Sequence, residues 1–323
     1  MRGLGLGLAS RRFSASGYGD DFVFTVETTG ASESFTIPCQ DIGTFNAIID
    51  WDDGSISSIT AYDDADLAHT YSDAGIHTIR VRGSFPNIYF NNDGDGAKVI
   101  SVIQLGKVGW ATLSGSFFGC SGLTSFTAGV CDTSAVEDLS NFLRLCVNLP
   151  SISLSGMNTS NISVLSNAFR NMNLLEALDL SVIDTSNVTT ISNMCRGNVM
   201  MASLNVAGID TSLLQNFQEG FYNCQLLNAD LSSLNFSSAS NLTNFLWNCD
   251  AMSAANLDLL LASIYAQRAS ITWETPALDI STLTNDPTGV YQDATPPTTG
   301  LEYVYKLVND PDAEGFNVWT ITY

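Results

Sequence analysis

Basic side chains are scarce in this chain. Among its 323 residues, 12 are Lys or Arg, 33 are Asp or Glu and two are His, which gives a formal net charge of −21. Nucleic acids and anionic lipid surfaces repel so acidic a chain, and we expect it to bind neither. Hydrophobic residues still make up 45% of the chain, which is enough for a globular core.

The motifs of catalysis and metal binding are also lacking. The sequence contains no G-x-S-x-G, H-E-x-x-H, P-loop or dinucleotide-binding pattern, and no C-x-x-C pair that would indicate zinc. We therefore expect no enzyme and no cofactor, and a hydrolase of surface glycans has no supporting residues.

Long hydrophobic runs are missing as well. No run is long enough to span a membrane, and the start M-R-G-L-G-L-G-L-A-S-R-R is too short and glycine-rich for a signal-peptide core. We expect neither membrane insertion nor export by the ordinary secretory route. Three of the twelve basic residues lie here, which favours residues 1–19 as an arm that docks onto an acidic partner subunit. The expected assembly residues are Arg2, Leu4, Leu6, Leu8, Arg11 and Arg12.

The most informative feature that the chain does have is an internal repeat. A triplet of Asp or Asn, Thr and Ser recurs with steps of 26, 26 and 26 residues, and a divergent copy with Phe at its second position follows after 25. A fixed period of this length predicts stacked units, each too small to bury an apolar face alone. The side chains expected to form a ladder of repeat turns are those of Asp132, Asn158, Asp184, Asp210 and Asn235.

Apolar residues keep the same register in each copy. The residues expected to start the copies are Leu123, Leu149, Leu175, Met201 and Leu226. Each begins an L-x-x-L-x-L core, such as Leu175, Leu178 and Leu180, which is typical of a strand with alternate side chains pointing into the stack. Later apolar residues, such as Val188, Ile191 and Cys195, have helical spacing, and the triplet before them can cap a helix or a turn. Each copy of 25–26 residues is predicted to be a strand followed by a short helix.

Residues 184–195 resemble the hallmark of the BspA-like leucine-rich repeats of bacterial and phage surface proteins, D-T-S-N-V-T-x-[MI]-S-x-M-F. The resemblance extends over about residues 111–256 and implies a leucine-rich-repeat solenoid. The family's usual Phe before the return loop is replaced by Leu143 in one copy and by Cys195 in another.

Residues 20–109 show period-two alternation between turns rich in Gly, Asp and Asn, which predicts a β-sandwich. The expected strands cover residues 22–28, 34–38, 46–51 and 77–83. Three segments of this region are I-D-W-D-D-G-S at 49–55, H-T-Y at 69–71 and G-I-H-T-I-R-V at 75–81. Together they are similar to the PKD-like, immunoglobulin-type domain, whose hallmark is W-G-D-G-T followed by H-T-Y-x-x-x-G-x-Y-T-V-x-V. Asp52 stands where that family has its first Gly. The resemblance implies that His69 and His77 are strand and turn residues instead of catalytic bases.

Acidic residues of this region offer two alternative calcium positions. The segment that contains Asp93 and Asp95 imitates the opening of an EF-hand loop, but its twelfth position is Val102 instead of a bidentate Glu. A plain hairpin turn is therefore favoured there. For Asp52 and Asp53, a solvated acidic face is favoured over calcium.

Cysteines and aromatic residues also recur in the repeats. Cys120, Cys146, Cys224 and Cys249 share one repeat phase, which favours small packing residues over disulfides between neighbouring copies. Four aromatic residues could form a face that stacks on carbohydrate: Trp110, Trp247, Tyr222 and Phe118. Packing in the core is favoured instead, because Phe118 and Trp247 fall in the core phase of the repeat.

The chain is thus predicted to be β-rich and mixed, with four parts: an arm (1–19), a PKD-like sandwich (20–109), repeats (110–256) and a C-terminal cap (257–323). The cap is expected to hide the apolar edge of the last copy. Its expected elements are a helix at 256–267, a helix at 301–308 and a strand at 316–323.

The two resemblances together imply a non-enzymatic structural protein of a phage virion, in the tail, the baseplate or a head fibre, that displays the repeat surface and attaches to the host cell. The alternative is a bacterial cell-surface adhesin. Expected partners are other virion proteins in a symmetric assembly, bound through the arm, and a host surface glycan or protein. The many Ser, Thr and Asn side chains suit a polar, neutral glycan bound through several repeats at once. An equal alternative is that this face only spaces and shields the particle.

Overall fold

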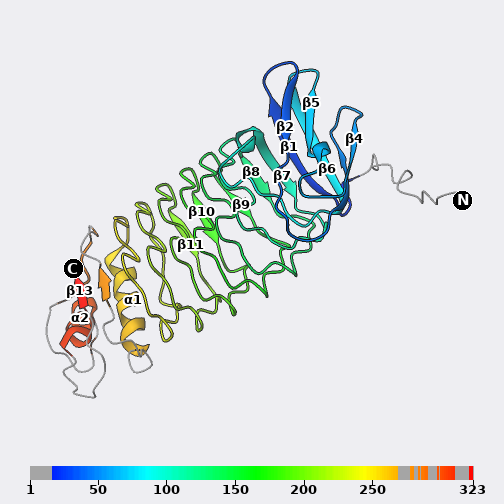
Figure 1. Ribbon diagram of the computed structural model, residues 1–323. Helices are drawn as coiled ribbons and strands as arrows, with labels where there is room; N and C mark the ends of the chain where they lie inside the picture. Colours follow the sequence, from blue (N-terminus) through cyan, green and yellow to red (C-terminus); the bar gives the residue numbers. More distant parts are fainter. Residues whose placement is uncertain are drawn as a thin grey trace, which may run out of the picture.

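A computed structural model describes residues 17–267, 277–279, 283, 285–289, 297, 299–309 and 320–322. The expected assembly residues of the arm (Arg2, Leu4, Leu6, Leu8, Arg11 and Arg12) lie outside the described residues. The molecule is β-rich and mixed, with a seven-stranded mixed sheet, smaller sheets and few helices. Figure 1 shows the N-terminal strands at one end, a stack of similar coils in the middle and the C-terminal helices at the other end.

The N-terminal region contains most strands of the large sheet. Its order is β4-β3-β6-β1-β7-β8-β9, and the four pairings among the first five of these strands are antiparallel. They are β1 (Phe22–Thr28), β3 (Asn46–Asp50), β4 (Ile56–Ile59), β6 (Gly75–Ser84) and β7 (Val99–Gln104). A second pair is formed by β2 (Glu33–Thr36) and β5 (Ala68–Tyr71), and two 3-10 turns are η1 (Ala65–Leu67) and η2 (Gly96–Lys98). The four strands predicted from sequence are confirmed to within a few residues.

The large sheet continues into the repeats. Strand β7 pairs in parallel with β8 (Ser125–Thr127), and β8 pairs in parallel with β9 (Ile152–Ser153). Strands β10 (Ala177–Asp179) and β11 (Ser203–Asn205) form the next parallel pair. The sheet therefore crosses the expected boundary at 109/110, and the buried side chains of both regions belong to one hydrophobic core.

The second half of each copy differs from the prediction. Where a short helix was expected, the described repeats contain successive turns. Two kinds of backbone hydrogen bond alternate along the chain here. One kind closes a turn within the copy, as from Ala168 N to Leu165 O (3.1 Å), and the other joins the next copy, as from Phe169 N to Met194 O (2.9 Å). Amides that bond to the next copy cannot form an i→i−4 helix, so this half of the copy is a second parallel ladder.

Backbone conformation explains why these turns cannot be helical. Two residues in each copy, four positions apart, have positive φ, whereas a right-handed helix needs negative φ throughout. Asn and Gly tolerate positive φ best, and they occupy most of these positions. The pairs are Gly115 and Gly119, Asn141 and Leu145, Asn167 and Asn171, Asn193 and Gly197, Glu219 and Asn223, and Asn244 and Asn248.

Leu145 is an exception that can be tested, because its φ of 61° places a leucine where other copies have Asn or Gly. Leu145→Asn is expected to raise the free energy of unfolding by up to about 1 kcal/mol, since Asn adopts this conformation with less strain. The reverse change, Asn171→Leu, is expected to lower it by a similar amount. Urea unfolding measures both, and a destabilised Leu145→Asn would show that packing of the leucine outweighs the backbone strain.

The predicted apolar register is confirmed with one correction. Leu123, Leu149, Leu175 and Met201 are fully buried, but Leu226 is 44% exposed and Leu227 occupies the buried place. The last step between triplets is 25 residues instead of 26, and the one-residue deletion therefore lies after Leu227. Leu178 and Leu180 are both buried; Leu178 lies within β10 and Leu180 one residue beyond it.

The predicted C-terminal helix is confirmed as α1 (Ala254–Gln267), which buries Leu257, Leu260, Leu261 and Ile264. A second helix, α2 (Gly300–Asn309), covers the segment predicted at 301–308. Strand β12 (Ala277–Asp279) pairs in parallel with β13 (Thr320–Thr322), the described part of the strand predicted at 316–323. Among the described residues, no helix is long and apolar enough to cross a membrane.

Candidate binding surface

The Asp or Asn of each triplet forms the same polar turn in its copy. In every copy the side-chain oxygen of the Asp or Asn accepts a bond from the backbone N–H two residues later, as from Ser186 N to Asp184 Oδ1 (3.0 Å). The equivalent acceptors are Asp132, Asn158, Asp210 and Asn235. The acceptor residues of these turns are exposed, except for the half-buried Asn235, and each satisfies the backbone of its own copy.

The middle threonine of the triplet joins neighbouring copies. Thr133, which is fully buried, donates from Oγ1 to Asn158 O (2.8 Å) and accepts from Asn158 N (2.8 Å). Thr211 makes the same pair of bonds with Asn235. Thr159 Oγ1 accepts from Asp184 N, and Thr185 Oγ1 donates to Asp210 O (2.7 Å in each case). The threonines therefore hold the register of the stack from inside.

Thr133→Val should lower the free energy of unfolding by about 1–3 kcal/mol, because it leaves the part-buried N–H and C=O of Asn158 without these partners. The exposed strand residue Thr127 offers a matched control, and Thr127→Val should change stability by less than about 0.5 kcal/mol. Equal effects of the two changes in denaturant unfolding would contradict the proposed role of the threonine ladder.

The acidic members of the ladder have lowered pKa values. For Asp132 and Asp184 the main cause is the hydroxyl of the serine two residues later, followed by its backbone N–H. For Asp210 the backbone N–H of Ser212 contributes most. A carboxyl group with a lowered pKa stabilises the fold above its unfolded pKa, near 3.9, and loses that contribution as the pH falls through its folded pKa.

A triple variant in which Asp132, Asp184 and Asp210 are each changed to Asn tests this pH dependence. An amide oxygen serves the same turn at Asn158 and Asn235, so the variant should fold at neutral pH. Below about pH 4 its stability should fall less steeply than that of the unaltered protein. Parallel curves of unfolding free energy between pH 6 and pH 3 would contradict the contribution of these carboxylates.

Both alternative calcium positions hold carboxylates that bond to the protein. Asp95 pairs with Lys98 (2.8 Å) and accepts from Thr36 N, and Asp93 accepts from Gly94 N. Asp52 accepts from Thr78 N, and Asp53 pairs with His69 (2.7 Å). In the part of the chain that the structure describes, no three His, Cys, Asp or Glu side chains lie close enough to hold a metal ion.

The two histidines pack among aromatic rings in the N-terminal region. His69 stacks on the buried Trp51 with centroids 4.9 Å apart, and His77 stacks on Tyr71 at 3.6 Å. His77 also contacts Thr28 Oγ1 at 3.0 Å. His77 lies on β6, within the strand predicted at 77–83, whereas His69 lies on β5, which none of the predicted strands covers.

The repeat cysteines are packing residues in this structure. Cys120, Cys146, Cys224 and Cys249 are all free and buried, and burial raises the pKa of Cys249 to about 12. Three of these thiols donate to backbone carbonyls of the preceding copy, as from Cys146 Sγ to Phe117 O (3.2 Å). Thiols held in this way are poor nucleophiles.

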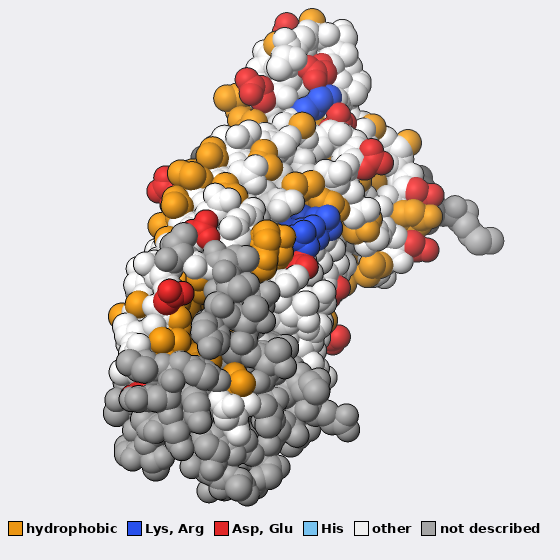
Figure 2. All heavy atoms as spheres, turned by 90° about the vertical axis from the view of Figure 1, so that its left-hand side faces the viewer, with side chains coloured by type: hydrophobic (Ala, Val, Ile, Leu, Met, Phe, Trp, Pro, Cys, Tyr) orange, Lys and Arg blue, Asp and Glu red, His pale blue; other side chains and the backbone are white. Residues whose placement is uncertain are grey.

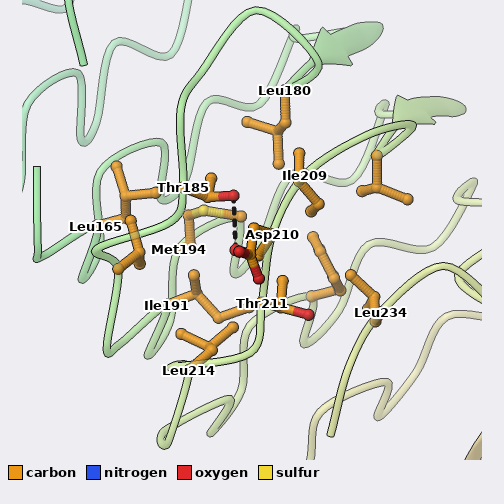
Figure 3. Close-up of a pocket in the computed structure, with 13 residues that line it drawn as sticks. Leu165, Leu180, Thr185, Ile191, Met194, Ile209, Asp210, Thr211, Leu214 and Leu234 are labelled. Carbon is orange, nitrogen blue, oxygen red and sulfur yellow. Dashed lines mark hydrogen bonds between the residues drawn. The ribbon is translucent and has the colours of Figure 1, made fainter. Parts of the chain in front are cut away.

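An apolar gap lies inside the stack, between the copies that contain Leu180 and Leu234 (Figure 3). Its polar lining residues are Thr185, Asp210 and Thr211, and Figure 3 marks the ladder bond between Thr185 and Asp210. The Asp210 carboxylate is engaged in its own turn with Ser212. The gap is therefore a feature of core packing and offers no reactive group.

A column of cationic and aromatic side chains runs across the repeats and was missed by sequence reasoning. Its members occupy one repeat position, and we call them the arginine column: Phe118, Arg144, Arg170, Arg196, Tyr222 and Trp247. The Arg144 guanidinium lies over the Phe118 ring (4.6 Å) and that of Arg196 over the Tyr222 ring (4.5 Å). Tyr222 stacks on Trp247 with centroids 4.5 Å apart.

The placement of these aromatic residues corrects one prediction. Phe118 and Trp247 were expected in the core, but both are only partly buried and belong to the surface column, whereas Trp110 is buried and donates from Nε1 to Leu105 O (2.9 Å). The signal that would have revealed the column is the recurrence of Arg at intervals of 26 residues. These three arginines are the only basic residues between positions 110 and 256.

Comparison with known proteins agrees with the repeat assignment. Residues 112–194 and 137–258 match the model of a family described as a Mycoplasma protein of unknown function, DUF285. The matched region is thus related to BspA-like leucine-rich repeats, and the match covers somewhat less than half of the chain. No curated protein and no solved structure matches this chain.

Proposed function

We propose that this chain is a non-enzymatic structural protein of a phage virion, in which a PKD-like sandwich carries a leucine-rich-repeat solenoid that attaches to the host cell. The observation that carries the proposal is the stack itself. Its parallel ladders repeat the same side chains along an extended face, and such arrays in other proteins present surfaces for binding. The partners would be other virion proteins in a symmetric assembly and a glycan or protein of the host surface.

The interior of the stack also favours binding over catalysis. Its polar groups, such as the buried Thr133 and Thr211, are used to join neighbouring copies. Its thiols are buried and bonded to backbone carbonyls. What the stack offers to other molecules is therefore its exposed outer face.

The second candidate is a bacterial cell-surface adhesin, which the same repeat surface supports. Mass spectrometry of purified phage particles, alongside fractionation of the bacterial cells, separates the two. The virion proposal expects the chain in particles at a stoichiometry that matches a symmetric assembly. Recovery only in the cell envelope fraction would replace it with the adhesin, and recovery only in the soluble cell fraction would contradict both.

A further inference from the structure

The arginine column is the one concentration of positive charge in the repeats. Figure 2 shows a blue patch in the middle of the stack with hydrophobic side chains beside it. Arg144, Arg170 and Arg196 lie on consecutive copies, and copies joined by β-ladders are about 4.8 Å apart. Three like charges at this spacing repel one another, so the arrangement opposes folding unless another contact offsets the repulsion.

The charges of the column are only partly compensated within the protein. Arg196 pairs with Glu219, whereas no carboxylate among the described residues lies within 4.0 Å of Arg144 or Arg170. Burial lowers the pKa of both, and for Arg170 the two neighbouring arginines lower it further. The column therefore has a local net charge of about +2 on a chain whose net charge is −21.

The hydrogen-bonding capacity of the guanidinium groups is also unfilled. Each group donates to one amide oxygen of its own copy, as from Arg144 Nη1 to Asn141 Oδ1 (3.0 Å) and from Arg170 Nη1 to Asn167 Oδ1 (3.0 Å). The Nε atoms of Arg144 and Arg170 are buried and have no acceptor among the described residues. A guanidinium group has five N–H donors in a planar fork. With Nε buried and Nη1 bonded to the amide oxygen, the remaining Nη N–H groups are the donors that can reach a carboxylate, sulfate or phosphate.

Apolar side chains accompany the column. Leu174, Met200 and Leu226 follow Arg170, Arg196 and Tyr222 by four residues each, and they are 46%, 44% and 44% exposed. Large apolar side chains at the same repeat position form a strip on the surface, which marks a contact area for another molecule. A sugar ring presents a C–H face that can pack on such a strip while its acidic group reaches the guanidinium groups.

We propose that the arginine column binds an acidic glycan through one or two oxyanion groups held by Arg144 and Arg170. Three copies span only about 10 Å, which limits the number of anionic groups that can be engaged at once. The remaining acidic surface repels a densely charged chain, such as a nucleic acid or an acidic peptide. A mostly neutral sugar chain with one or two acidic groups fits this charge pattern, in place of the neutral glycan that composition favoured.

Titration of the full chain with short oligosaccharides tests the proposal, which rests on the proposed attachment function. The probes are trigalacturonate, its methyl-esterified neutral form, sulfated and phosphorylated trisaccharides, and triglutamate as the peptide arm. We expect at least one acidic sugar to bind at least tenfold more tightly than the neutral form, and its binding to weaken between 50 and 500 mM salt, roughly as charge screening predicts. Absence of binding by every acidic sugar, or equal binding of neutral sugar or of triglutamate, would overturn the proposal.

Two variants locate the binding on the column. R144Q/R170Q should lose at least tenfold in affinity, with unfolding curves to confirm that it folds. Glu219→Gln removes the carboxylate that pairs with Arg196 and should strengthen binding several-fold, a gain that misfolding cannot imitate. Unchanged affinity in both variants would overturn the assignment. If the chain adsorbs to host cells but R144Q/R170Q adsorbs equally well, the column assignment fails while the attachment function stands.

Discussion

Asp21→Ala is expected to lower the free energy of unfolding by about 3–5 kcal/mol, because it removes the acidic partner of a buried ion pair. The Asp21 side chain is 2% exposed, and its carboxylate accepts from Arg80 Nη2 (2.6 Å) and from Arg82 Nε (2.7 Å). Further bonds come from Arg80 Nε (3.1 Å) and Arg82 Nη2 (3.0 Å). Without this carboxylate, two partly buried cations on β6 face one another at the start of β1.

The neighbouring residue provides the control for this change. Asp20 pairs with Lys107 at 3.0 Å, but the two side chains are 67% and 51% exposed. Asp20→Ala should therefore cost less than about 1 kcal/mol, as exposed ion pairs contribute little. Urea unfolding at neutral pH compares the two variants, and a cost below 1 kcal/mol for Asp21→Ala would show that burial does not strengthen this pair.

Leu180→Ala is the second change for which a large effect is expected, a loss of about 2–5 kcal/mol. Leu180 is 3% exposed, lies beside β10 and lines the apolar gap of Figure 3, so truncation would enlarge a space that is already poorly filled. Val182, two residues later and 45% exposed, is the matched control. Val182→Ala should change stability by less than about 0.5 kcal/mol. A cost of the same size for both variants would contradict the register of the repeat.

The sequence predicted the repeat well, because burial in a stack imposes a strict periodicity on apolar side chains. Leu175, Leu178 and Leu180 could be assigned to the interior from spacing alone. The spacing of Val188, Ile191 and Cys195 fits a helix and a wide turn equally well, so the helix prediction was wrong. The deciding signal was the pair of Asn or Gly residues four positions apart, which positive φ requires.

Other features depend on contacts that spacing does not reveal. The parallel pairing of β7 with β8 joins segments that had been assigned to separate domains, and no local pattern indicates such a partner. The arginine column was not predicted because the net charge was considered over the whole chain, where three arginines among 12 basic and 33 acidic residues have little weight. Only their alignment on consecutive copies makes them one surface. The ladder of Asp132, Asn158, Asp184, Asp210 and Asn235 was predicted because the triplet itself recurs.

Adsorption of the protein to cells tests the central claim, that the repeat face is a binding face. The full chain, displayed in many copies on beads, is mixed with cells of the proposed bacterial host, with R144Q/R170Q as the comparison. The account predicts that the unaltered chain adsorbs, competes with whole particles and is released by high salt. Failure of the multivalent display to adsorb at micromolar concentration would contradict the claim and leave the stack as a spacer.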